Sequence, residues 1–177
     1  MIGVDIVDLT DPLLKPRSQR ELRFISHPND HCPKDIGEET LYWLLWAAKE
    51  AIFKAERQDQ AFSPKEIEVM YSKTVGDRLL YSGRWVNEIN GYSILKKDNI
   101  ISVVTTANIE AVKWNTFKLK TSNQSQELRD CFQKEMGPGF QLLRDVAGLP
   151  IVRHDGTTTP ASISHHHHLG VVAWIER

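Results

Sequence analysis

The sequence predicts an α+β protein in which an antiparallel sheet packs against one long helix. Three observations predict it: apolar residues recur at helical spacing over residues 38–57, short β-rich segments follow residue 64, and no internal repeat has a fixed period. The 177 residues are 41% hydrophobic and 25% charged, which is typical of a globular protein with its own core. This length fits one domain or two very small ones.

Composition and charge exclude several classes of function. The net charge of −1 gives no overall field for binding nucleic acid or an anionic membrane. No apolar run approaches the roughly 20 residues that cross a bilayer, and the N-terminus carries acids where a signal peptide needs cations. The two cysteines, Cys32 and Cys131, lack CxxC spacing. We therefore expect a cytoplasmic protein without nucleic-acid or membrane partners.

The first element is a short β-branched strand at residues 2–9. Side chains alternate along a strand, so Asp5 lies on the face opposite to Ile2, Val4 and Ile6. A basic stretch follows, helical from Ser18 onward, and its cations are Lys15, Arg17, Arg20 and Arg23.

The clearest helix spans residues 38–57, after a loop rich in proline. Its apolar residues recur at close to 3.6-residue spacing, and they are Leu41, Leu44, Leu45, Ala48, Ile52 and Ala55. Ala47, Ala48 and Ala51 are small enough to let this helix lie close to a sheet.

The remaining chain is mostly β. We expect strands at 66–72, 77–82, 85–95, 100–106 and 111–119, arranged as an antiparallel meander. A short helix at 126–136 ends at Gly137-Pro138-Gly139. Two or three further strands follow at 140–146, 149–153 and 162–176.

Three motifs suggest a function. They are Gly3-Val4-Asp5 in the first strand, Trp46-Ala47-Ala48-Lys49-Glu50-Ala51-Ile52-Phe53-Lys54 on the long helix, and Ser162-Ile163-Ser164-His165 before the last strand. Together they resemble the signatures of the 4′-phosphopantetheinyl transferase superfamily. Their order is similar to that of the small holo-acyl-carrier-protein synthases. The resemblance implies a 4′-phosphopantetheinyl transferase-like fold.

The resemblance also implies an activity. Such an enzyme transfers the 4′-phosphopantetheine arm of coenzyme A to a serine of an acyl or peptidyl carrier protein, as in fatty acid biosynthesis, and releases adenosine 3′,5′-bisphosphate. It implies that Asp5 and Glu50 bind Mg²⁺, and that Glu50 or a water beside the ion takes the serine proton. Catalytic Lys54, with Lys49, Ser164 and His165, would bind the coenzyme.

The residue types suit this chemistry independently of the resemblance. Transfer at a pyrophosphate needs charge neutralisation and in-line positioning. Mg²⁺ takes oxygen ligands and usually only one or two carboxylates, which Asp5 and Glu50 supply. Glu50 and Lys54 are four residues apart and share one helix face.

Other interpretations stay open. Glu50 and Lys54 also fit a surface ion pair worth about 0.2–0.5 kcal/mol, and the basic residues at 15–23 fit a carrier-docking surface and a solvated helix face equally well. The run His165 to His168 suggests either one family histidine or a metal-storage site. Val7 stands where the larger transferases have a second acid. A non-catalytic coenzyme A or carrier-protein binding module is therefore the rival.

The middle of the chain lies outside the resemblance. We expect a single domain over residues 1–177, with a β-rich insertion at about 71–140 that interrupts one strand pair formed by 62–69 and 143–151. Small synthases place each site between protomers of a trimer, whereas the larger group joins two units in one chain. Since this chain is too short for two complete units, a homo-oligomer is favoured over a monomer capped by the insertion.

Overall fold

The computed structural model describes residues 1–56 and 61–176. The elements in chain order are β1 (Ile2–Asp8), α1 (Gln19–Ile25), α2 (Glu38–Glu56), β2 (Glu68–Val75), β3 (Arg78–Arg84), β4 (Glu88–Leu95), β5 (Asn99–Thr105), β6 (Val112–Lys118), α3 (Gln124–Met136), β7 (Phe140–Arg144), β8 (Pro150–His154), β9 (Thr157–His166) and β10 (Leu169–Ile175). Single 3-10 turns precede β2 and β6. Among these described helices, none is long and apolar enough to cross a membrane.

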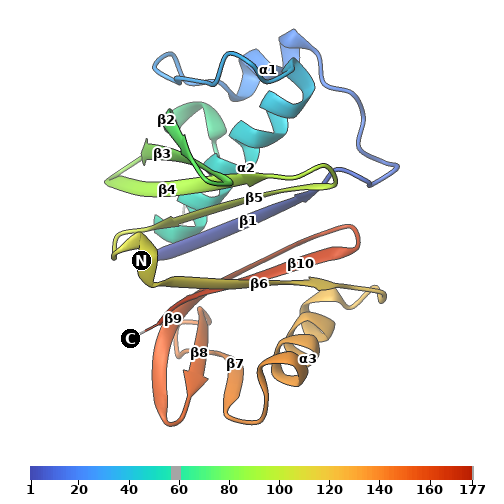
Figure 1. Cartoon of the computed structure of the whole chain (residues 1–177), viewed down its shortest axis with the longest axis vertical. Helices are drawn as coiled ribbons and strands as arrows, with labels where there is room; N and C mark the ends of the chain where they lie inside the picture. Colours follow the sequence, from blue (N-terminus) through green and yellow to red (C-terminus); the bar gives the residue numbers. More distant parts are fainter. Residues whose placement is uncertain (57–60, 177) are drawn as a thin grey trace.

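The strands form two five-stranded antiparallel sheets (Figure 1), ordered β1-β5-β4-β3-β2 and β6-β10-β9-β8-β7. We call β1 to β5 with α1 and α2 the first unit, and β6 to β10 with α3 the second unit. Each unit has a first strand, then helix (α1 and α2 in the first unit, α3 in the second) and four further strands, and its first strand pairs with its last. The two units therefore repeat one topology.

Three hydrophobic clusters divide the molecule into layers. One joins α2 to the first sheet and includes Leu44 and Ile100, both fully buried. A second lies between the two sheets, where Val4 meets Val171. A third packs Phe132 of α3 onto the second sheet. The order is helix, sheet, sheet, helix, and the alternation of β1 directs Ile2, Val4 and Ile6 towards the second unit.

Gly3 lets α2 lie directly on β1. A Cβ at Gly3 would lie 1.9 Å from the Ala51 carbonyl oxygen and 2.8 Å from the Ala55 nitrogen. This contact requires a glycine on the strand and small alanines opposite it on the helix. The glycine of the first motif thus has a packing role, because it sets the distance between Asp5 and the helix that carries Glu50 and Lys54.

Replacing Gly3 by alanine should destabilise the protein by at least about 1–3 kcal/mol, the usual cost of overpacking, because the collision is with backbone atoms. Urea denaturation measures the change. Gly37→Ala is the matched control, since a Cβ there has nothing within 4 Å, and it should cost about 1 kcal/mol or less. Equal losses in the two variants would contradict the close-approach argument.

The predicted fold class is confirmed, but two pairing predictions are wrong. The expected strand at 111–119 does not continue the meander, because β6 pairs with β10 in the second sheet. Segments 62–69 and 143–151 do not pair with each other: Val69 pairs with Gly83, and Leu143 pairs with Ile151. Residues 71–140 contribute strands to both sheets, and the predicted insertion stays a prediction. The chain also proves long enough for two small units.

Candidate functional site

The candidate site lies where β1 and α2 of the first unit meet β9 of the second. The Lys54 ammonium is 2.7 Å from Asp5 Oδ1 and donates to Ser164 Oγ at 3.0 Å. Ser164 in turn donates to Asp5 Oδ1 at 2.7 Å. Asp5 and Ser164 are buried, and Lys54 retains some exposure. Residues 159 positions apart in sequence thus form one closed triangle of charged and polar groups.

Glu50 joins this group through the same ammonium. Its Oε1 is 3.0 Å from Lys54 Nζ, and its Oε2 accepts a hydrogen bond from Trp46 Nε1 at 2.9 Å. Positions 46, 50 and 54 follow one face of α2 because each is four residues from the next. The Asp5 and Glu50 carboxylates therefore face one common point, as the motif spacing predicts.

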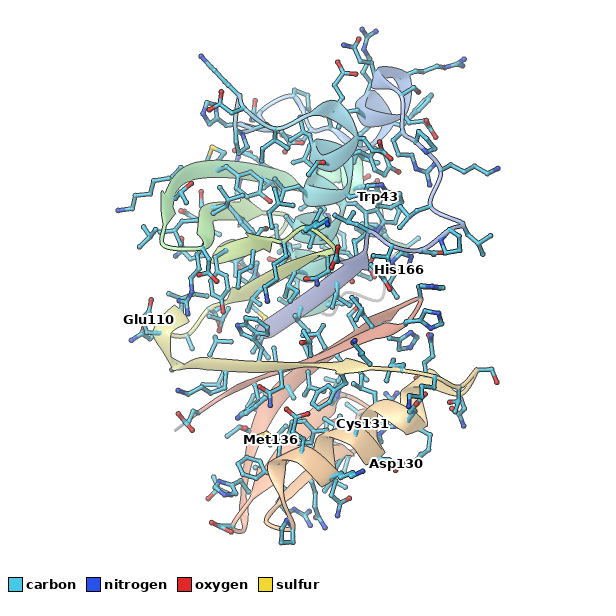
Figure 2. All side chains as sticks on the ribbon, turned by 45° about the vertical axis from the view of Figure 1, so that its right-hand side comes forward. Trp43, Glu110, Asp130, Cys131, Met136 and His166 are labelled. Carbon is cyan, nitrogen blue, oxygen red and sulfur yellow. The ribbon has the colours of Figure 1, made fainter. Side chains whose placement is uncertain are left out.

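Alternate side chains of β9 cover the free edge of β1. Ser162 Oγ accepts the Val4 N–H at 3.0 Å, and His166 Nδ1 accepts the Asp8 N–H at 2.9 Å. Ser164 lies between them and contacts Asp5. His166 lies beside the end of β1 (Figure 2). This side-chain ladder satisfies outward N–H groups that β5 cannot reach, and it fixes the position of Asp5 against the second unit.

The electrostatics show an excess of negative charge. Burial raises the pKa of Asp5 to about 6, Lys54 opposes this, and the Glu50 charge adds to the rise. Burial alone would lower the pKa of Lys54, but the Asp5 and Glu50 charges outweigh it and raise that pKa. Two carboxylates share one ammonium, so a further cation at this position would be favourable.

The donor set fits Mg²⁺. Asp5 and Glu50 provide hard carboxylate oxygens directed at one position, and Mg²⁺ needs only one or two protein carboxylates, with water and substrate phosphate completing the octahedron. Over residues 1–56 and 61–176, no group of three or more His, Cys, Asp or Glu side chains is arranged to hold a metal ion.

Asp5 should make stability depend on pH in a defined direction. With a pKa of about 6 against 3.8 in an unfolded chain, folded protein keeps a proton that unfolded protein loses between about pH 4 and 6. This contribution to the free energy of unfolding therefore falls as pH rises through that window. Asp5→Asn should gain stability relative to wild type over the same window, measured by urea denaturation without divalent cations. A difference in the free energy of unfolding between Asp5→Asn and wild type that does not change with pH would contradict the raised pKa of Asp5.

The four histidines do not all meet at one point, although His166 and His167 both lie beside Asp11, and the ring centroids of His167 and His168 are 3.7 Å apart. His165 is exposed and its Nε2 lies 3.4 Å from Ser125 Oγ. His166 uses Nδ1 as an acceptor, and its Nε2 is 3.4 Å from Asp11 Oδ2. His167 adopts a φ of 51° in the turn before β10. Burial lowers the pKa of His165, and Lys54 lowers it further, so this histidine lies within electrostatic range of the candidate site.

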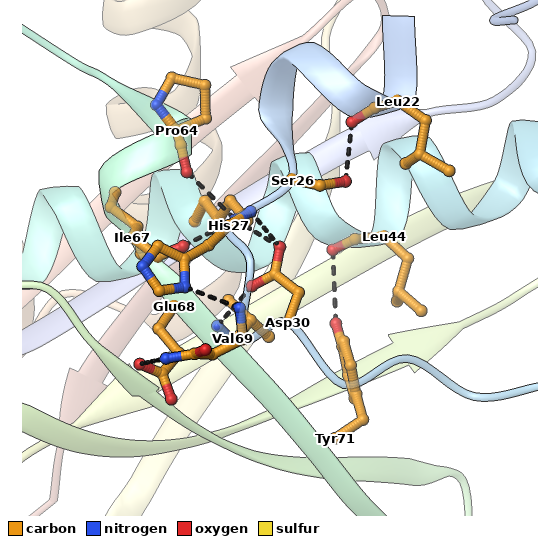
Figure 3. Close-up of polar contacts among 12 residues, drawn as sticks. Leu22, Ser26, His27, Asp30, Leu44, Pro64, Ile67, Glu68, Val69 and Tyr71 are labelled. Carbon is orange, nitrogen blue, oxygen red and sulfur yellow. Dashed lines mark hydrogen bonds and ion pairs between the residues drawn. The ribbon is translucent and has the colours of Figure 1, made fainter. Parts of the chain in front are cut away.

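The structure places Lys49 apart from Asp5, Glu50 and Lys54, and its predicted role in binding the coenzyme stays a prediction. Its ammonium is fully buried, 2.7 Å from Asp30 Oδ2, and donates to the carbonyls of Pro64 and Ile67. Asp30 also accepts the N–H groups of His27 and Val69 (Figure 3). Since 49 and 54 are five residues apart, they point roughly 140° apart around the helix.

Sequence analysis named Ser162 in the last motif but missed its contact with the Val4 N–H, and it missed the contacts of His166 and Asp30. Ser162 and His166 share the face of β9 that carries Ser164, so strand alternation applied to the last motif would have found them. Asp30 lies in a loop with no pattern that marks it. The predicted helix end at residue 57 lies outside the described residues.

A groove of about 610 Å³ lies between the units at the end of β1, three residues beyond Asp5. One wall carries Asp8 and Thr10, and the other carries Lys118, Lys120 and His168. Burial raises the pKa of Asp8, but hydrogen bonds from Thr10 and the His168 N–H outweigh it, so the net shift is downward.

Fold and site together define a class of protein. It is an α+β protein of two similar units, and two carboxylates and an ammonium gather where the units meet. The carboxylates suit a divalent cation, and the ammonium suits phosphate. The model of the 4′-phosphopantetheinyl transferase superfamily matches residues 1–103, more than half of the chain, so the chain belongs to that superfamily. The match includes Asp5, Glu50 and Lys54 and ends before the second unit. No curated protein matches the chain.

Proposed function

We propose that this protein transfers the 4′-phosphopantetheine arm of coenzyme A to a serine of an acyl or peptidyl carrier protein, in the manner of the small holo-acyl-carrier-protein synthases. The observation that carries the proposal is the convergence of Asp5, Glu50 and Lys54 with Ser164 of the second unit. Superfamily membership supplies the reaction class.

The reaction requires in-line attack at phosphorus. The serine oxygen forms a bond to the phosphorus nearer the pantetheine, the bond from that phosphorus to the bridging oxygen breaks, and adenosine 3′,5′-bisphosphate leaves. Glu50 is the more exposed of the two carboxylates and would accept the serine proton. Lys54 would neutralise phosphate charge, while Ser164 keeps Asp5 oriented.

Asp5 and Glu50 are the residues that would hold Mg²⁺, which supplies neutralisation of the pyrophosphate charge when bound. The groove beyond Asp5 would take the nucleotide end of the coenzyme, since Lys118 and Lys120 line it. Exposed His165 lies on β9, next to Ser164, and is a second candidate for phosphate contact.

The test is a transfer assay with coenzyme A, Mg²⁺ and several apo carrier proteins, read by the mass added to the carrier. We expect the mass of the phosphopantetheine arm on a native carrier, none on a carrier whose serine is alanine, and none with Mg²⁺ chelated. Absence of transfer to every carrier would refute the proposal. Coenzyme A binding that does not depend on Mg²⁺ and gives no product would favour the rival, a non-catalytic binding module. Buried Val7 motivates this rival, because a valine at that position leaves the candidate site with only two carboxylates.

The basic surface around α1 is the proposed carrier-docking surface. Arg17 has a structural role, since it pairs with Glu21 and lies 4.9 Å from the Trp43 ring centroid. Lys15, Arg20 and Arg23 remain, and α1 begins beside the first residues of α2 (Figure 1).

Charge reversal at Lys15 and Arg20 should weaken carrier binding and reduce its dependence on salt, because acidic carriers would lose attraction and meet repulsion. The measurement is the KM for the carrier at two ionic strengths. The control is reversal of exposed Lys96 and Lys97 between β4 and β5, which should leave KM unchanged. Equal effects of both pairs would exclude α1 as the specific surface.

A further inference from the structure

A hollow of about 210 Å³ opens on the second unit, on the face of its sheet that carries α3. The helix packs against β6, β7 and β10 and ends at Met136 (Figure 2). Val152 of β8, Thr159 of β9 and Trp174 of β10 line the hollow. The second sheet thus keeps part of this face open to a ligand.

The hollow is separate from the candidate site. Thr159 and Ser164 are five positions apart on β9, and side chains an odd number of positions apart point to opposite faces of a strand. Ser164 contacts Asp5 of the first unit, whereas Thr159 lines the hollow on the α3 face. A ligand in the hollow therefore does not compete with the transfer chemistry for the same groups.

Aromatic rings form part of the wall. The rings of Phe140 and His154 are stacked, with centroids 3.8 Å apart and planes 13° apart. The Trp174 ring lies 6.4 Å from Phe140 at an interplanar angle of 67°. The faces of such rings attract cations, and tryptophan does so most strongly. The wall therefore suits a flat or cationic group.

Two carboxylates, Asp155 and Glu176, also line the hollow, and no lysine or arginine among residues 1–56 and 61–176 lines it. Glu176 is already 3.1 Å from the Lys113 ammonium. Asp155 instead contacts a histidine, since its Oδ2 is 3.3 Å from His154 Nε2. The hollow therefore favours a positively charged ligand, and Asp155 is the carboxylate best placed to pair with it.

The β8–β9 turn holds Asp155 in place. Asp155 and Gly156 have φ values of 47° and 79°, as in the two-residue type I′ turn of a tight hairpin. On its other side the carboxylate lies beside Gly139, where a Cβ would come within 3.1 Å of Asp155 Oδ1. The charge is thus fixed next to the stacked rings rather than carried on a mobile loop.

Thr159 adds an unused hydroxyl. The residue is only 8% exposed, and its hydroxyl makes no hydrogen bond within the part of the chain that the structure describes. A buried polar group without a partner is costly. A ligand that donates a hydrogen bond to Thr159 Oγ1 would remove that cost.

We propose that this hollow binds a guanidinium group, carried either by a small guanidine or by an arginine side chain of a protein partner. A guanidinium is planar, always charged and has five N–H donors, so it stacks on aromatic faces and pairs with a carboxylate at the same time. The volume lies below the roughly 300–1,000 Å³ of sites for drug-sized ligands, which suits a single such group. The proposal is independent of the transfer function.

The test is an NMR titration of the full chain with butylguanidine, followed at the signals of His154, Thr159 and Trp174. We expect saturable shifts with a Kd on the order of 1 mM, because so small a ligand makes few contacts. Butylurea has the same shape without the charge, and pentylamine has the charge without the planar fork. Each should bind about tenfold more weakly or worse, as for loss of a charged hydrogen bond.

Two results of this titration would overturn the proposal. One is the absence of saturable shifts at these residues up to about 20 mM butylguanidine, well above the expected Kd. The other is equal affinity for butylguanidine and either analogue. The peptide acetyl-Gly-Arg-Gly-amide distinguishes the two sources of the group. Affinity equal to that of butylguanidine would assign the hollow to an arginine of a partner, and binding about tenfold weaker would assign it to a free guanidine.

Two variants test the named contacts. Asp155→Asn should weaken butylguanidine binding by about tenfold or more, and asparagine tolerates the left-handed backbone at this turn. Thr159→Val should weaken binding by about threefold without lowering the urea midpoint, because its hydroxyl has no partner to lose. Asp77→Asn, at the exposed β2–β3 turn, is the control and should leave Kd unchanged. An unchanged Kd in folded Asp155→Asn would overturn the proposal.

Discussion

Glu50→Gln is expected to lower kcat for phosphopantetheine transfer by about 10²–10⁴-fold, the range for loss of a positioned general base. Glutamine keeps the shape of the side chain and an oxygen for the Trp46 indole N–H, so α2 should remain in place. It removes one of the two charges that hold Lys54 and would hold Mg²⁺. The measurement is kcat and KM for coenzyme A across a Mg²⁺ titration.

Glu39→Gln is the matched control, because Glu39 lies on the same helix and is exposed. It should leave kcat unchanged. Circular dichroism and urea denaturation should show both variants folded, since Glu50 is only partly buried. Near-normal turnover of folded Glu50→Gln would remove Glu50 from the chemistry and leave Asp5 and Lys54 as a structural ion pair.

Local patterns predicted the elements that carry the site. The helix at 38–57 was predictable because its apolar residues repeat along a single face, and α2 begins at the predicted residue. The spacing of Glu50 and Lys54 fixed their common face for the same reason. Asp5 was predictable as a strand acid, and Gly3 explains why that strand meets the alanine face of the helix.

Nonlocal pairing escaped sequence analysis. The second unit repeats the topology of the first with different residues, so no sequence period marks it. Strand pairing depends on contacts between segments that are distant in the sequence. A series of similar predicted strands therefore does not show which strand is the last of the first sheet. The same limit hid the ladder of Ser162 and His166 along β1.

Lys49→Met should destabilise the protein by about 3–5 kcal/mol, the cost of removing one partner of a buried ion pair. The loss leaves the Asp30 carboxylate buried without its cation, and leaves the Pro64 and Ile67 carbonyls without a donor. Burial lowers the pKa of Lys49 although Asp30 opposes it, so holding this charge inside the protein is already costly. Urea denaturation measures the change, and exposed Lys34→Met serves as control.

The double variant Lys49→Met/Asp30→Asn separates a structural role from a coenzyme-binding role. Removing both charges should recover part of the lost stability, because no unpaired carboxylate remains buried. The recovery should be incomplete, since His27 and Val69 donate to different oxygens of Asp30 and asparagine keeps only one oxygen. The KM for coenzyme A of the folded double variant should match wild type, since the ammonium points away from Lys54. A KM raised tenfold or more, or about 1.4 kcal/mol of lost binding, with stability restored would return Lys49 to the coenzyme site.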